Sequence, residues 1–277
     1  MNNPLISVVT VVYNSVTTIE QTILSVINQT YLNIEYIIID GGSTDGTVDI
    51  IKRYADKLAY WVSEPDEGIY DAMNKGIAVA TGEWLNFMNS GDGFPQEQVL
   101  QAVFTNEENT RPEVGVIYGD RICVFSFGRY YQVCQPLDCM NTFFPIFHQS
   151  VWIRHSLAVS HPFDKSYKIG ADYHQLYTLY KENFVFRYIP RALSVFDSEY
   201  GVSSSLSNRF RMYIEVSRVL NTKVPIKVYF VVALAWIKVP IQKLISKVYP
   251  AYFSAQKRGE RLLKRSKSLR RLEEKKD

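Results

Sequence analysis

Four short polar clusters in this sequence carry carboxylate, amide and hydroxyl groups, and each stands directly after an apolar run. One of them, "DGGSTDGT", opens with Asp40, which follows four consecutive strand-like residues. Its carboxylate could accept hydrogen bonds from a base or a ribose, and Gly41 and Gly42 allow a sharp turn and a close approach of a ligand to the backbone. A simpler interpretation also fits: Asp40 and Ser43 cap the turn, and Asp45 begins the next helix.

The elements that must position these clusters alternate between strand and helix. Apolar runs rich in β-branched residues are typical of strands, and apolar residues that return every three to four positions are typical of amphipathic helices. The expected strands are 6–12, 36–39, 59–62, 84–88 and 114–118, and the expected helices between them are 17–27, 47–54, 69–80 and 96–104. This alternation predicts an α/β fold with a Rossmann-like, mostly parallel sheet flanked by helices.

Beyond residue 120 the pattern is less regular. Short strands are expected in "ICVFSFGRYYQV" and "FHQSVWIR", then a helix at 171–181, a strand at 186–195 and helical structure after Ser203. The chain is therefore expected to divide into an α/β domain at 1–202 and a helical, basic C-terminal region at 203–277.

The polar clusters fall where an open α/β sheet binds its ligands, outside the carboxyl ends of the strands. They are Tyr13-Asn14, Asp40-Gly41, Ser63-Glu64 and Asn89-Ser90-Gly91-Asp92. A dinucleotide site is disfavoured, because the first strand is followed by "YNSVTT" and not by G-x-G-x-x-G.

Taken in order, several segments resemble the family 2 glycosyltransferases with the GT-A fold, and in particular bacterial members that build surface polysaccharides. The segments are "VVTVVYN", "DGGSTDGT", "EPDEGIYDAMNKGIAVATGEWLNFMNSGD" and "HQSV" followed by "GADYH". The resemblance spans roughly residues 5 to 200, and its specificity lies in the order and spacing of the segments. It implies a GT-A catalytic domain at 1–202 that transfers a sugar from a nucleotide donor.

The resemblance implies a donor site built from two regions. The end of the first strand and the following aspartate turn would hold the nucleotide, through Tyr13, Asn14, Asp40 and Ser43. The helix in "YDAMNKG" would border the diphosphate and the sugar, through Asp71, Asn74 and Lys75. A purely structural interpretation of that helix is also open, because its apolar residues are spaced as a core face and Lys75 could be solvated.

The metal motif departs from the family pattern. The family usually places two acids at the end of the fourth strand, where they orient a divalent cation that neutralises the departing diphosphate. Here the segment is "MNSGD", in which Asn89 and Gly91 stand where acids often stand and only Asp92 is a carboxylate. One carboxylate with phosphates and water can still hold Mg²⁺ or Mn²⁺. A structural turn is the alternative for Asp92.

A catalytic base and an acceptor-side wall are also implied by the resemblance. Asp172, near the start of a helix after a glycine, matches the position of the family's base, which takes the proton of an acceptor hydroxyl. An ordinary carboxylate at a helix N-terminus is the competing and compatible interpretation. His148 and Gln149 resemble the acceptor-side wall. His161 and His174 lack the spacing partners of a zinc site.

The C-terminal region has a charge opposite to the rest of the chain. Residues 1–222 contain 16 basic and 24 acidic side chains, whereas 223–277 contain 15 and 4. The uncharged run 228–237 is too short to cross a bilayer, which needs about 20 residues. Flanking lysines and aromatic residues predict a monotopic contact with an anionic membrane surface through 223–277. A helical hairpin packed on the catalytic domain or on a second subunit is the alternative.

Composition places the catalytic part in the cytoplasm. Three cysteines without a C-x-x-C pair indicate reduced thiols, and the N-terminus lacks the basic region and length of a signal peptide. We expect a peripheral or monotopic protein on the inner face of the cytoplasmic membrane, with no nucleic-acid partner and with oligomer formation possible.

These observations lead to one expected function and two rivals. The expected function is an inverting glycosyltransferase that moves a sugar from a UDP-, GDP- or dTDP-linked donor to a hydroxyl of a glycan in surface-polysaccharide synthesis. The glycan acceptor is expected to be lipid-linked. The "NSGD" segment has one carboxylate where the family usually has two, so a non-catalytic protein that binds nucleotide sugars or glycans stays open as an alternative. A nucleotidyltransferase is disfavoured, because no glycine-rich triphosphate loop lies near the N-terminus.

Overall fold

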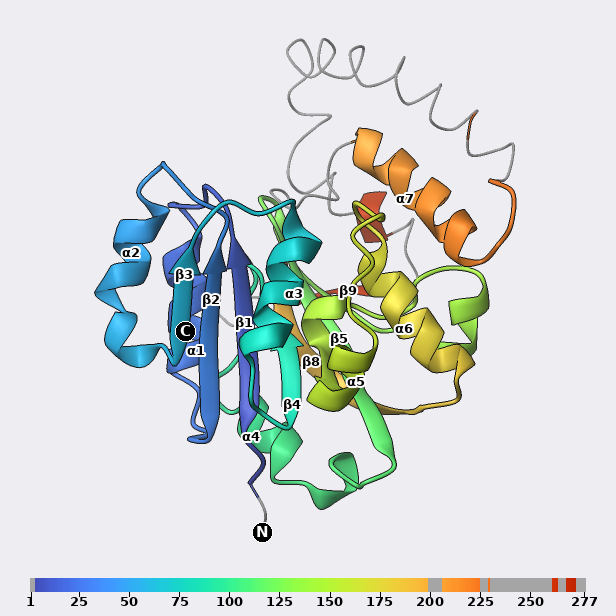
Figure 1. Cartoon of the computed structure of the whole chain (residues 1–277). Coiled ribbons are helices and arrows are strands. Elements are labelled where there is room, and N and C mark those ends of the chain that lie inside the picture. Colours follow the sequence, from blue (N-terminus) through green and yellow to red (C-terminus); the bar gives the residue numbers. More distant parts are fainter. Residues whose placement is uncertain (1–2, 199–205, 225–228, 230–260, 264–267, 273–277) are drawn as a thin grey trace.

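The structure is a computed structural model of the whole chain and describes residues 3–198, 206–224, 229, 261–263 and 268–272. One mixed β-sheet forms its centre, with helices on both faces (Figure 1). The strands run in the order β3-β2-β1-β4-β7-β5-β6-β9, and β8 pairs with β5. Their bounds are β1 (Ile6–Val12), β2 (Ile34–Asp40), β3 (Tyr60–Ser63), β4 (Trp84–Phe87), β5 (Val114–Phe125), β6 (Gly128–Gln132), β7 (Val151–Arg154), β8 (Val185–Asp197) and β9 (Leu269–Arg271).

The helices connect and cover these strands. The α-helices are α1 (Ile19–Ile27), α2 (Thr47–Arg53), α3 (Ile69–Val79), α4 (Val99–Phe104), α5 (His155–Ser160), α6 (Ala171–Lys181) and α7 (Leu206–Val219). Short 3₁₀ turns occupy Ala55–Lys57, Glu107–Asn109, Leu137–Asn141 and His148–Ser150. The last of these turns lies directly before β7 and carries the two residues expected on the acceptor side.

Strands β1 to β4 form the parallel half of the sheet, as the sequence predicted. In the sheet register Val12 lies beside Asp40, and Asp40 lies beside Ser63. All seven residues of β1 are buried, which explains the continuous apolar run of a parallel strand covered on both faces. The carboxyl ends of β1, β2 and β3 therefore meet at one edge of the sheet, and the polar clusters follow there.

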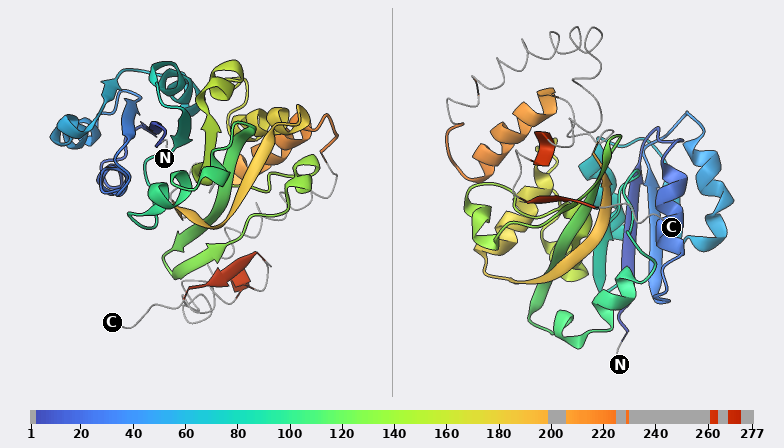
Figure 2. Two further views of the ribbon diagram at one scale, coloured as in Figure 1. Left: turned by 90° about the horizontal axis from the view of Figure 1, so that it is seen from below. Right: turned by 180° about the vertical axis from the view of Figure 1, so that it is seen from behind.

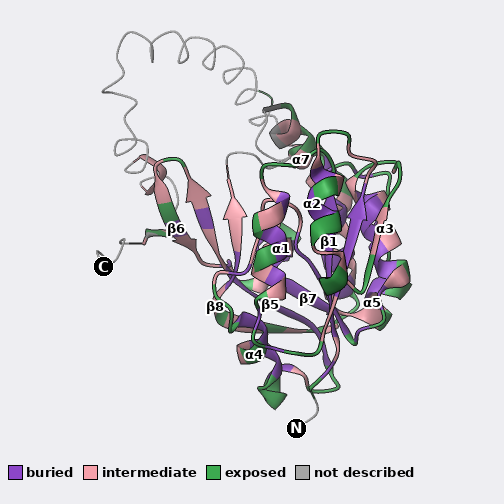
Figure 3. Ribbon diagram, turned by 90° about the vertical axis from the view of Figure 1, so that its left-hand side faces the viewer, coloured by how far each residue is buried: buried purple, intermediate pink, exposed green. Residues whose placement is uncertain are grey.

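The side chains of β1 alternate between two cores. Val9 and Val11 face a core shared with α3, α5 and α6, whereas Ile6 and Val8 face a core shared with α1, α2 and α4. This alternation is the two-residue period of a strand. In Figure 3 the buried residues follow the strands and the inward sides of the helices.

The second half of the sheet corrects the expectation of a mostly parallel sheet. Strand β7 pairs antiparallel with both β4 and β5, and β6 pairs antiparallel with β5, while β8 is parallel to β5. In Figure 2 the long β5 and β8 run side by side. Alternating apolar runs show that strands exist, but pairing direction depends on contacts between distant segments, so the sequence pattern did not show it.

The C-terminal tail corrects a second expectation. Residues 261–263 are helical, as expected for the tail, but Leu269–Arg271 form β9 and pair antiparallel with β6. The N–H of Val133 donates to Ser268 O (3.0 Å), and the N–H of Leu272 donates to Arg129 O (3.0 Å). The unpaired backbone groups of an edge strand favour this pairing, whatever the side-chain pattern of the tail.

The helical structure expected after Ser203 is present as α7, which lies beyond the expected domain boundary at residue 202. Val216, Val219 and Leu220 pack against the core on the α3 and α6 face. In the part of the chain that is described, no helix is long and apolar enough to span a membrane. The expected membrane contact at 223–277 lies largely outside the described residues.

Candidate functional site

Reciprocal hydrogen bonds join the loops that follow β1 and β2. The N–H of Asn14 donates to Ser43 Oγ (2.7 Å), and the N–H of Thr44 donates to Asn14 Oδ1 (2.9 Å). Asn14 has a φ of 46°, a left-handed conformation that asparagine adopts more readily than most residues. The two loops form one unit, and the preceding Tyr13 is 63% exposed at its surface.

Asp40 ends β2 with a fully buried side chain. Its carboxylate accepts hydrogen bonds from the N–H groups of Gly42 (3.1 Å) and Ser43 (2.9 Å) and from the hydroxyls of Ser43 and Ser63. Three of these donors bond Oδ2 and one bonds Oδ1, so most of the accepting positions of the carboxylate are used. Asp40 therefore fixes the shape of its loop, as in the simpler sequence interpretation, and its direct contact with a nucleotide stays a prediction.

Gly41 lies between Tyr13 and Asp66. A Cβ at this position would clash with Asp66 Oδ2 and stand 3.3 Å from Tyr13 Cδ2. The other carboxylate oxygen, Asp66 Oδ1, accepts the N–H of Gly68 (2.8 Å). This corner of the sheet edge thus offers an exposed aromatic face, a bare backbone and a carboxylate oxygen, which together suit a planar base that both stacks and donates hydrogen bonds.

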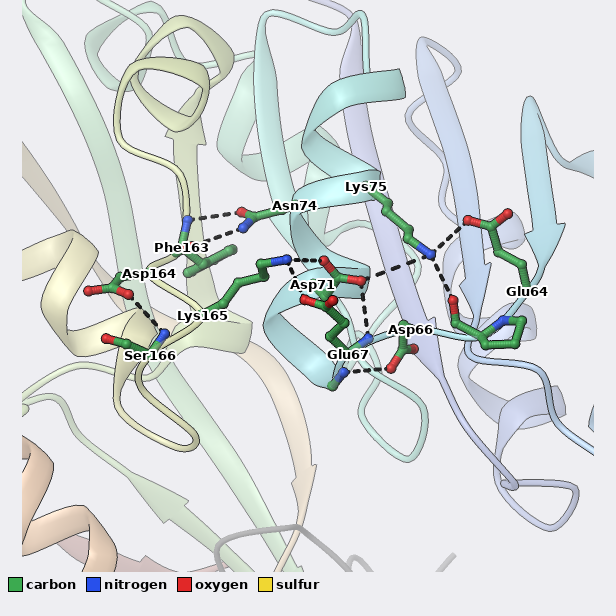
Figure 4. Close-up of polar contacts among 12 residues, drawn as sticks. Glu64, Asp66, Glu67, Asp71, Asn74, Lys75, Phe163, Asp164, Lys165 and Ser166 are labelled. Carbon is green, nitrogen blue, oxygen red and sulfur yellow. Dashed lines mark hydrogen bonds and ion pairs between the residues drawn. The ribbon is translucent and has the colours of Figure 1, made fainter.

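Ion pairs connect the start of α3 with loops on both of its sides (Figure 4). Lys75 Nζ donates to Glu64 Oε1 (2.7 Å) and lies 4.0 Å from Asp71 Oδ2. Lys165 Nζ donates to Glu67 Oε2 (2.7 Å) and to Asp71 Oδ1 (2.9 Å). The hydrogen bond from Lys165 helps to hold the pKa of Asp71 below its usual value. Both predicted residues, Asp71 and Lys75, are already paired within the chain, and their contact with a donor stays a prediction.

Asn74 bonds the loop before α6 with both ends of its side-chain amide. Its Nδ2 donates to Phe163 O (2.9 Å), and its Oδ1 accepts the N–H of Phe163 (2.9 Å), as Figure 4 shows. Both ends of the amide bond one backbone unit, and Asn74 thereby clamps α3 to the loop before α6. Its direct contact with a donor stays a prediction. Phe163 is distant in the sequence, which is why the local motif did not reveal this contact.

Asp92 follows β4 and is 8% exposed. Burial raises the pKa of its carboxyl to about 7, although His148, a hydrogen bond from Gln149 and the charge of Arg121 act in the opposite direction. Asp197 adds a smaller repulsion that also raises this pKa. Carboxyl groups that titrate near neutrality are concentrated at functional sites. The structure thus brings Asp92 together with both residues expected on the acceptor side.

Open space adjoins Asp92. A cavity of about 380 Å³ is lined by Asp92 together with Gln21 and Ser25 of α1, Arg129 of β6 and Val195 of β8. A polar ligand that reached Asp92 would find hydroxyl, amide and guanidinium groups around it.

The oxygen atoms around Asp92 suit a hard divalent cation. Asn89 Oδ1 and Gln149 Oε1 are buried and have no hydrogen-bond partner among the described residues. Carboxylate and amide oxygens are the ligands that Mg²⁺ and Mn²⁺ prefer. Within the described ranges, no group of three or more His, Cys, Asp or Glu residues could hold a metal ion. A cation here would therefore depend on one carboxylate, amide oxygens and the phosphates of a donor, and the residues present fit that demand.

Asp172 lies in the first turn of α6 and is 9% exposed. Its Oδ2 is 3.3 Å from His148 Nδ1, and its Oδ1 accepts from Tyr70 OH (3.3 Å) and from the N–H of Tyr173 (2.8 Å). The other ring nitrogen, His148 Nε2, lies 3.3 Å from Asn89 Nδ2. A continuous polar chain therefore runs from the catalytic candidate on α6 through His148 to the loop after β4.

Most of the predicted residues fall into two groups, and helix α3 is bonded to a loop on each of its two sides. Tyr13, Asn14, Asp40 and Ser43 form the first group, at the ends of β1 and β2, and Asp92, His148, Gln149 and Asp172 form the second. Helix α3 is bonded to the loop after β3 through Lys75 and to the loop before α6 through Asp71.

Four residues at the site were missed from the sequence. Asp66 and Tyr70 lie within the segment "EPDEGIYDAMNKG". That segment was part of the family resemblance, but neither residue was named as a site candidate. Arg121 on β5 has its guanidinium carbon 4.1 Å and 4.4 Å from the ring centroids of Phe147 and Phe196. The fourth, Glu215, lies on α7. No local pattern marks Arg121 or Glu215, because their partners are distant in the sequence.

The mixed sheet and the polar cluster at its carboxyl edge define a GT-A-type glycosyltransferase. The chain belongs to Glycosyl transferase family 2, whose sequence model matches residues 7–174. This match confirms the resemblance seen in the motifs. The match ends at α6, so it includes Asp172 and excludes α7.

Curated relatives are also glycosyltransferases. An uncharacterised glycosyltransferase of Mycobacterium tuberculosis is 46% identical over 102 residues, which is 36% of this chain and 39% of that protein. A PGL/p-HBAD biosynthesis glycosyltransferase of Mycobacterium bovis is 27% identical over 248 residues, 86% of this chain and 93% of that protein. The chain thus matches 39% of the length of the first relative and nearly all of the second.

Solved structures share the fold. A mannosyltransferase from Pyrobaculum calidifontis in complex with GDP-Man and Mn²⁺ has a TM-score of 0.61 at 19% identity, covering 93% of this chain and 83% of its own. TarS of S. aureus in complex with UDP has a TM-score of 0.58 at 22% identity, covering 78% and 64%. Glucosyl-3-phosphoglycerate synthase from M. tuberculosis, with Mn²⁺, UDP and phosphoglyceric acid, has a TM-score of 0.55 at 16% identity, covering 78% of each chain.

Proposed function

We propose that this glycosyltransferase moves a sugar, with inversion, from a nucleotide-diphosphate donor to a hydroxyl of a glycan acceptor. One observation carries the proposal: the segment His148-Gln149 lies beside both candidate carboxylates. His148 Nδ1 lies 3.3 Å from Asp172 Oδ2, while the His148 ring and the Gln149 amide both act to lower the pKa of Asp92. A potential base and a potential diphosphate site therefore flank one short turn, as a single displacement at an anomeric carbon requires.

The proposed reaction forms one bond and breaks one. The acceptor oxygen bonds to the anomeric carbon, and the bond from that carbon to the diphosphate oxygen breaks. The electron pair leaves with the nucleoside diphosphate, and the acceptor's proton passes to the Asp172 carboxylate. Attack on the face opposite the leaving group inverts the anomeric centre.

The donor would lie across the carboxyl edge of β1, β2 and β4. Tyr13 would stack on the base, and Asp66 would accept hydrogen bonds from it beside Gly41, with the loop held by Asp40, Asn14 and Ser43. Asp71 and Lys75 would border the diphosphate and the sugar. Structural neighbours bound to GDP-Man or UDP support a nucleotide donor of this class.

A divalent cation, Mg²⁺ or Mn²⁺, would be held by Asp92 with the amide oxygens of Asn89 and Gln149. When bound, such a cation neutralises the charge that develops on the departing diphosphate. Neighbours solved with Mn²⁺ support this assignment. The sequence adds the setting: we propose a lipid-linked acceptor of surface-polysaccharide synthesis at the inner membrane face, which the basic region 223–277 would contact.

A nucleotide-release assay tests the assignment. Purified full-length protein is incubated with UDP-, GDP- and dTDP-sugars and Mn²⁺, with membrane lipid extract as the acceptor source. We expect release of one nucleoside diphosphate, and we expect Asp172→Asn to reduce it by about 10²- to 10⁴-fold, the usual contribution of a general base. Binding of the same nucleoside diphosphate, measured by calorimetry, should be retained.

The matched control is Asp49→Asn. Asp49 also lies in the first turn of a helix, α2, but its side chain is 85% exposed and remote from His148. If Asp172 were only a helix N-terminal carboxylate, both variants would release nucleotide at comparable rates. That result would overturn the proposed base.

A further inference from the structure

Glu215 of α7 makes an unusual contact with the loop that leads into α6. The residue is 7% exposed, and its carboxylate accepts three consecutive backbone N–H groups. Oε1 accepts from Lys168 (3.0 Å), and Oε2 accepts from Ile169 (2.9 Å) and Gly170 (2.8 Å). Hydrogen bonds to an ionised acceptor are stronger than neutral ones, so three on one buried carboxylate form a firm attachment.

This contact fixes the backbone directly before α6 and satisfies the N–H of its N-cap residue. Helix α6 begins at Ala171, and its N-cap residue, Gly170, makes no side-chain cap hydrogen bond. The first N–H groups of a helix need acceptors, and a negative charge near them is favourable. Glu215, on a different helix, accepts the N–H of the N-cap residue Gly170 and brings a negative charge close to the helix start, and Asp172 stands only two residues beyond Gly170.

A side chain at position 170 would pack tightly against Glu215. A Cβ there would lie 3.3 Å from both the Cβ and the Oε2 of Glu215. The glycine of "IGADYH" therefore permits the close approach of α7, whereas a Cβ at this position would require the Glu215 side chain to shift by a few tenths of an ångström.

Two further contacts hold the same loop from opposite sides. From α3, Tyr70 OH donates to Ile169 O (2.5 Å) and also lies 3.3 Å from Asp172 Oδ1. From α7, Arg218 donates to Ser166 Oγ (2.9 Å), and its guanidinium carbon lies 4.2 Å from the ring centroid of Tyr167. The loop before Asp172 is thus clamped between α3 and α7.

We propose that Glu215 is a positioning residue for the catalytic base, and that α7 belongs to the catalytic unit. By fixing the start of α6, Glu215 keeps the Asp172 carboxylate beside His148 and within reach of an acceptor hydroxyl. This inference rests on the proposed role of Asp172. Glu215 lies outside residues 7–174, so the family match does not assign it.

The experiment compares Glu215→Gln with the parent protein. Glutamine keeps the shape of the side chain but replaces one accepting oxygen with an NH₂ group, which faces a backbone N–H. We expect kcat for nucleotide release to fall about 10- to 100-fold, the range expected when a catalytic group is misplaced by about 1 Å. We expect the Kd of UDP or GDP, measured by calorimetry, to change less than about two-fold, because the nucleotide loops are not bonded to Glu215.

The control variant is Glu182→Gln, just after the other end of α6. Glu182 has a side chain that is 48% exposed and pairs with His161. The Glu182→Gln substitution also removes one negative charge near α6, and we expect it to leave kcat unchanged. Amide hydrogen exchange adds a readout independent of turnover: the N–H groups of 168–170 should exchange faster in Glu215→Gln and not in Glu182→Gln.

Gly170→Ala provides a second route if Glu215→Gln does not fold. It leaves both carboxylates intact and displaces only the contact, so we expect a reduced kcat with retained nucleotide binding. Full kcat and unchanged exchange at 168–170 in a folded Glu215 variant would overturn the inference. If Asp172→Asn itself retained full transfer, the proposed role of Asp172 as the base would be wrong. That outcome differs from a failure of the Glu215 inference alone, in which Asp172→Asn loses transfer and the Glu215 variant does not.

Discussion

At the scale of single residues, Asp92 shows how burial sets the proton balance of the site. Its folded pKa is about 7, whereas an aspartate in an unfolded chain titrates near 4. The folded protein therefore binds this proton more tightly than the unfolded chain. It follows that the Asp92 carboxyl lowers the free energy of unfolding as the pH rises from about 4 to about 7.

We expect Asp92→Asn to stabilise the metal-free protein at high pH. Removing a buried charge should raise the free energy of unfolding at pH 8 by roughly 2–4 kcal/mol and leave it little changed near pH 4. Urea unfolding in EDTA at several pH values measures this difference. The exposed Asp138→Asn should show no such pH-dependent gain. An Asp92→Asn protein that is less stable than the parent at pH 8 would contradict the expectation.

The residue scale also shows what the sequence could reveal of the site. Asp92 and Asp172 were singled out because each lies in a motif of the family resemblance beside an element boundary, and their roles stay predictions. The buried state of Asp40, with four donors on its carboxylate, could not be read from "DGGSTDGT", because one donor is the hydroxyl of Ser63 on another strand. Glu215 was missed for the same reason, since its partners lie on a loop far along the chain.

At the scale of elements, the prediction concerns Asn74 and the attachment of α3. Asn74→Ala should remove two hydrogen bonds and leave the partly buried backbone groups of Phe163 unsatisfied. We expect the free energy of unfolding to fall by about 1–3 kcal/mol, with little change in nucleotide affinity. Urea unfolding and calorimetry with UDP or GDP measure the two effects.

A matched control for this prediction is Asn141→Ala, which removes an exposed amide that bonds Asp138 O and Tyr180 OH. It should alter stability less. If Asn74→Ala weakened nucleotide binding about ten-fold at unchanged stability, Asn74 would instead be the donor ligand that the sequence motif implied.

Local signals predicted the elements where those signals decide the structure. The strand at 6–12 and the helix at 171–181 have their expected bounds, because a continuous buried run and an amphipathic period specify them. The expected strand at 114–118 instead extends to Phe125, where pairing with β6 and β8 continues beyond the apolar run. Strand β9 was missed, because its basic sequence has no strand period and only the edge of β6 makes it a strand.

At the scale of the whole molecule, the charge division of the sequence predicts a salt-sensitive membrane interaction. The excess of basic residues in 223–277 should attract anionic lipid, while the acidic remainder should not. We expect full-length protein to co-sediment with vesicles that contain anionic lipid at about 0.1 M salt and to be released near 0.5 M, where screening is stronger. Vesicles of zwitterionic lipid are the control, and equal binding to both would contradict an electrostatic contact.

The packing of α7 bears on the domain expected at 1–202. Helix α7 packs its apolar residues on the core and holds the loop before α6 through Glu215. We therefore propose that the functional unit continues through α7. A boundary after residue 202 would separate Asp172, the proposed base, from Glu215, the residue proposed to position it.

The pairing of β9 with β6 has a consequence for how the chain is made. Strand β6 leaves the ribosome long before β9, because the two are far apart in the sequence. Until 268–272 emerge, the outer edge of β6 lacks that partner, and an open edge can pair with a second nascent chain. The shortness of β6 and the charge of Arg129 discourage such pairing. Closing this edge is therefore a late, non-local step of folding, completed only after synthesis has passed β9.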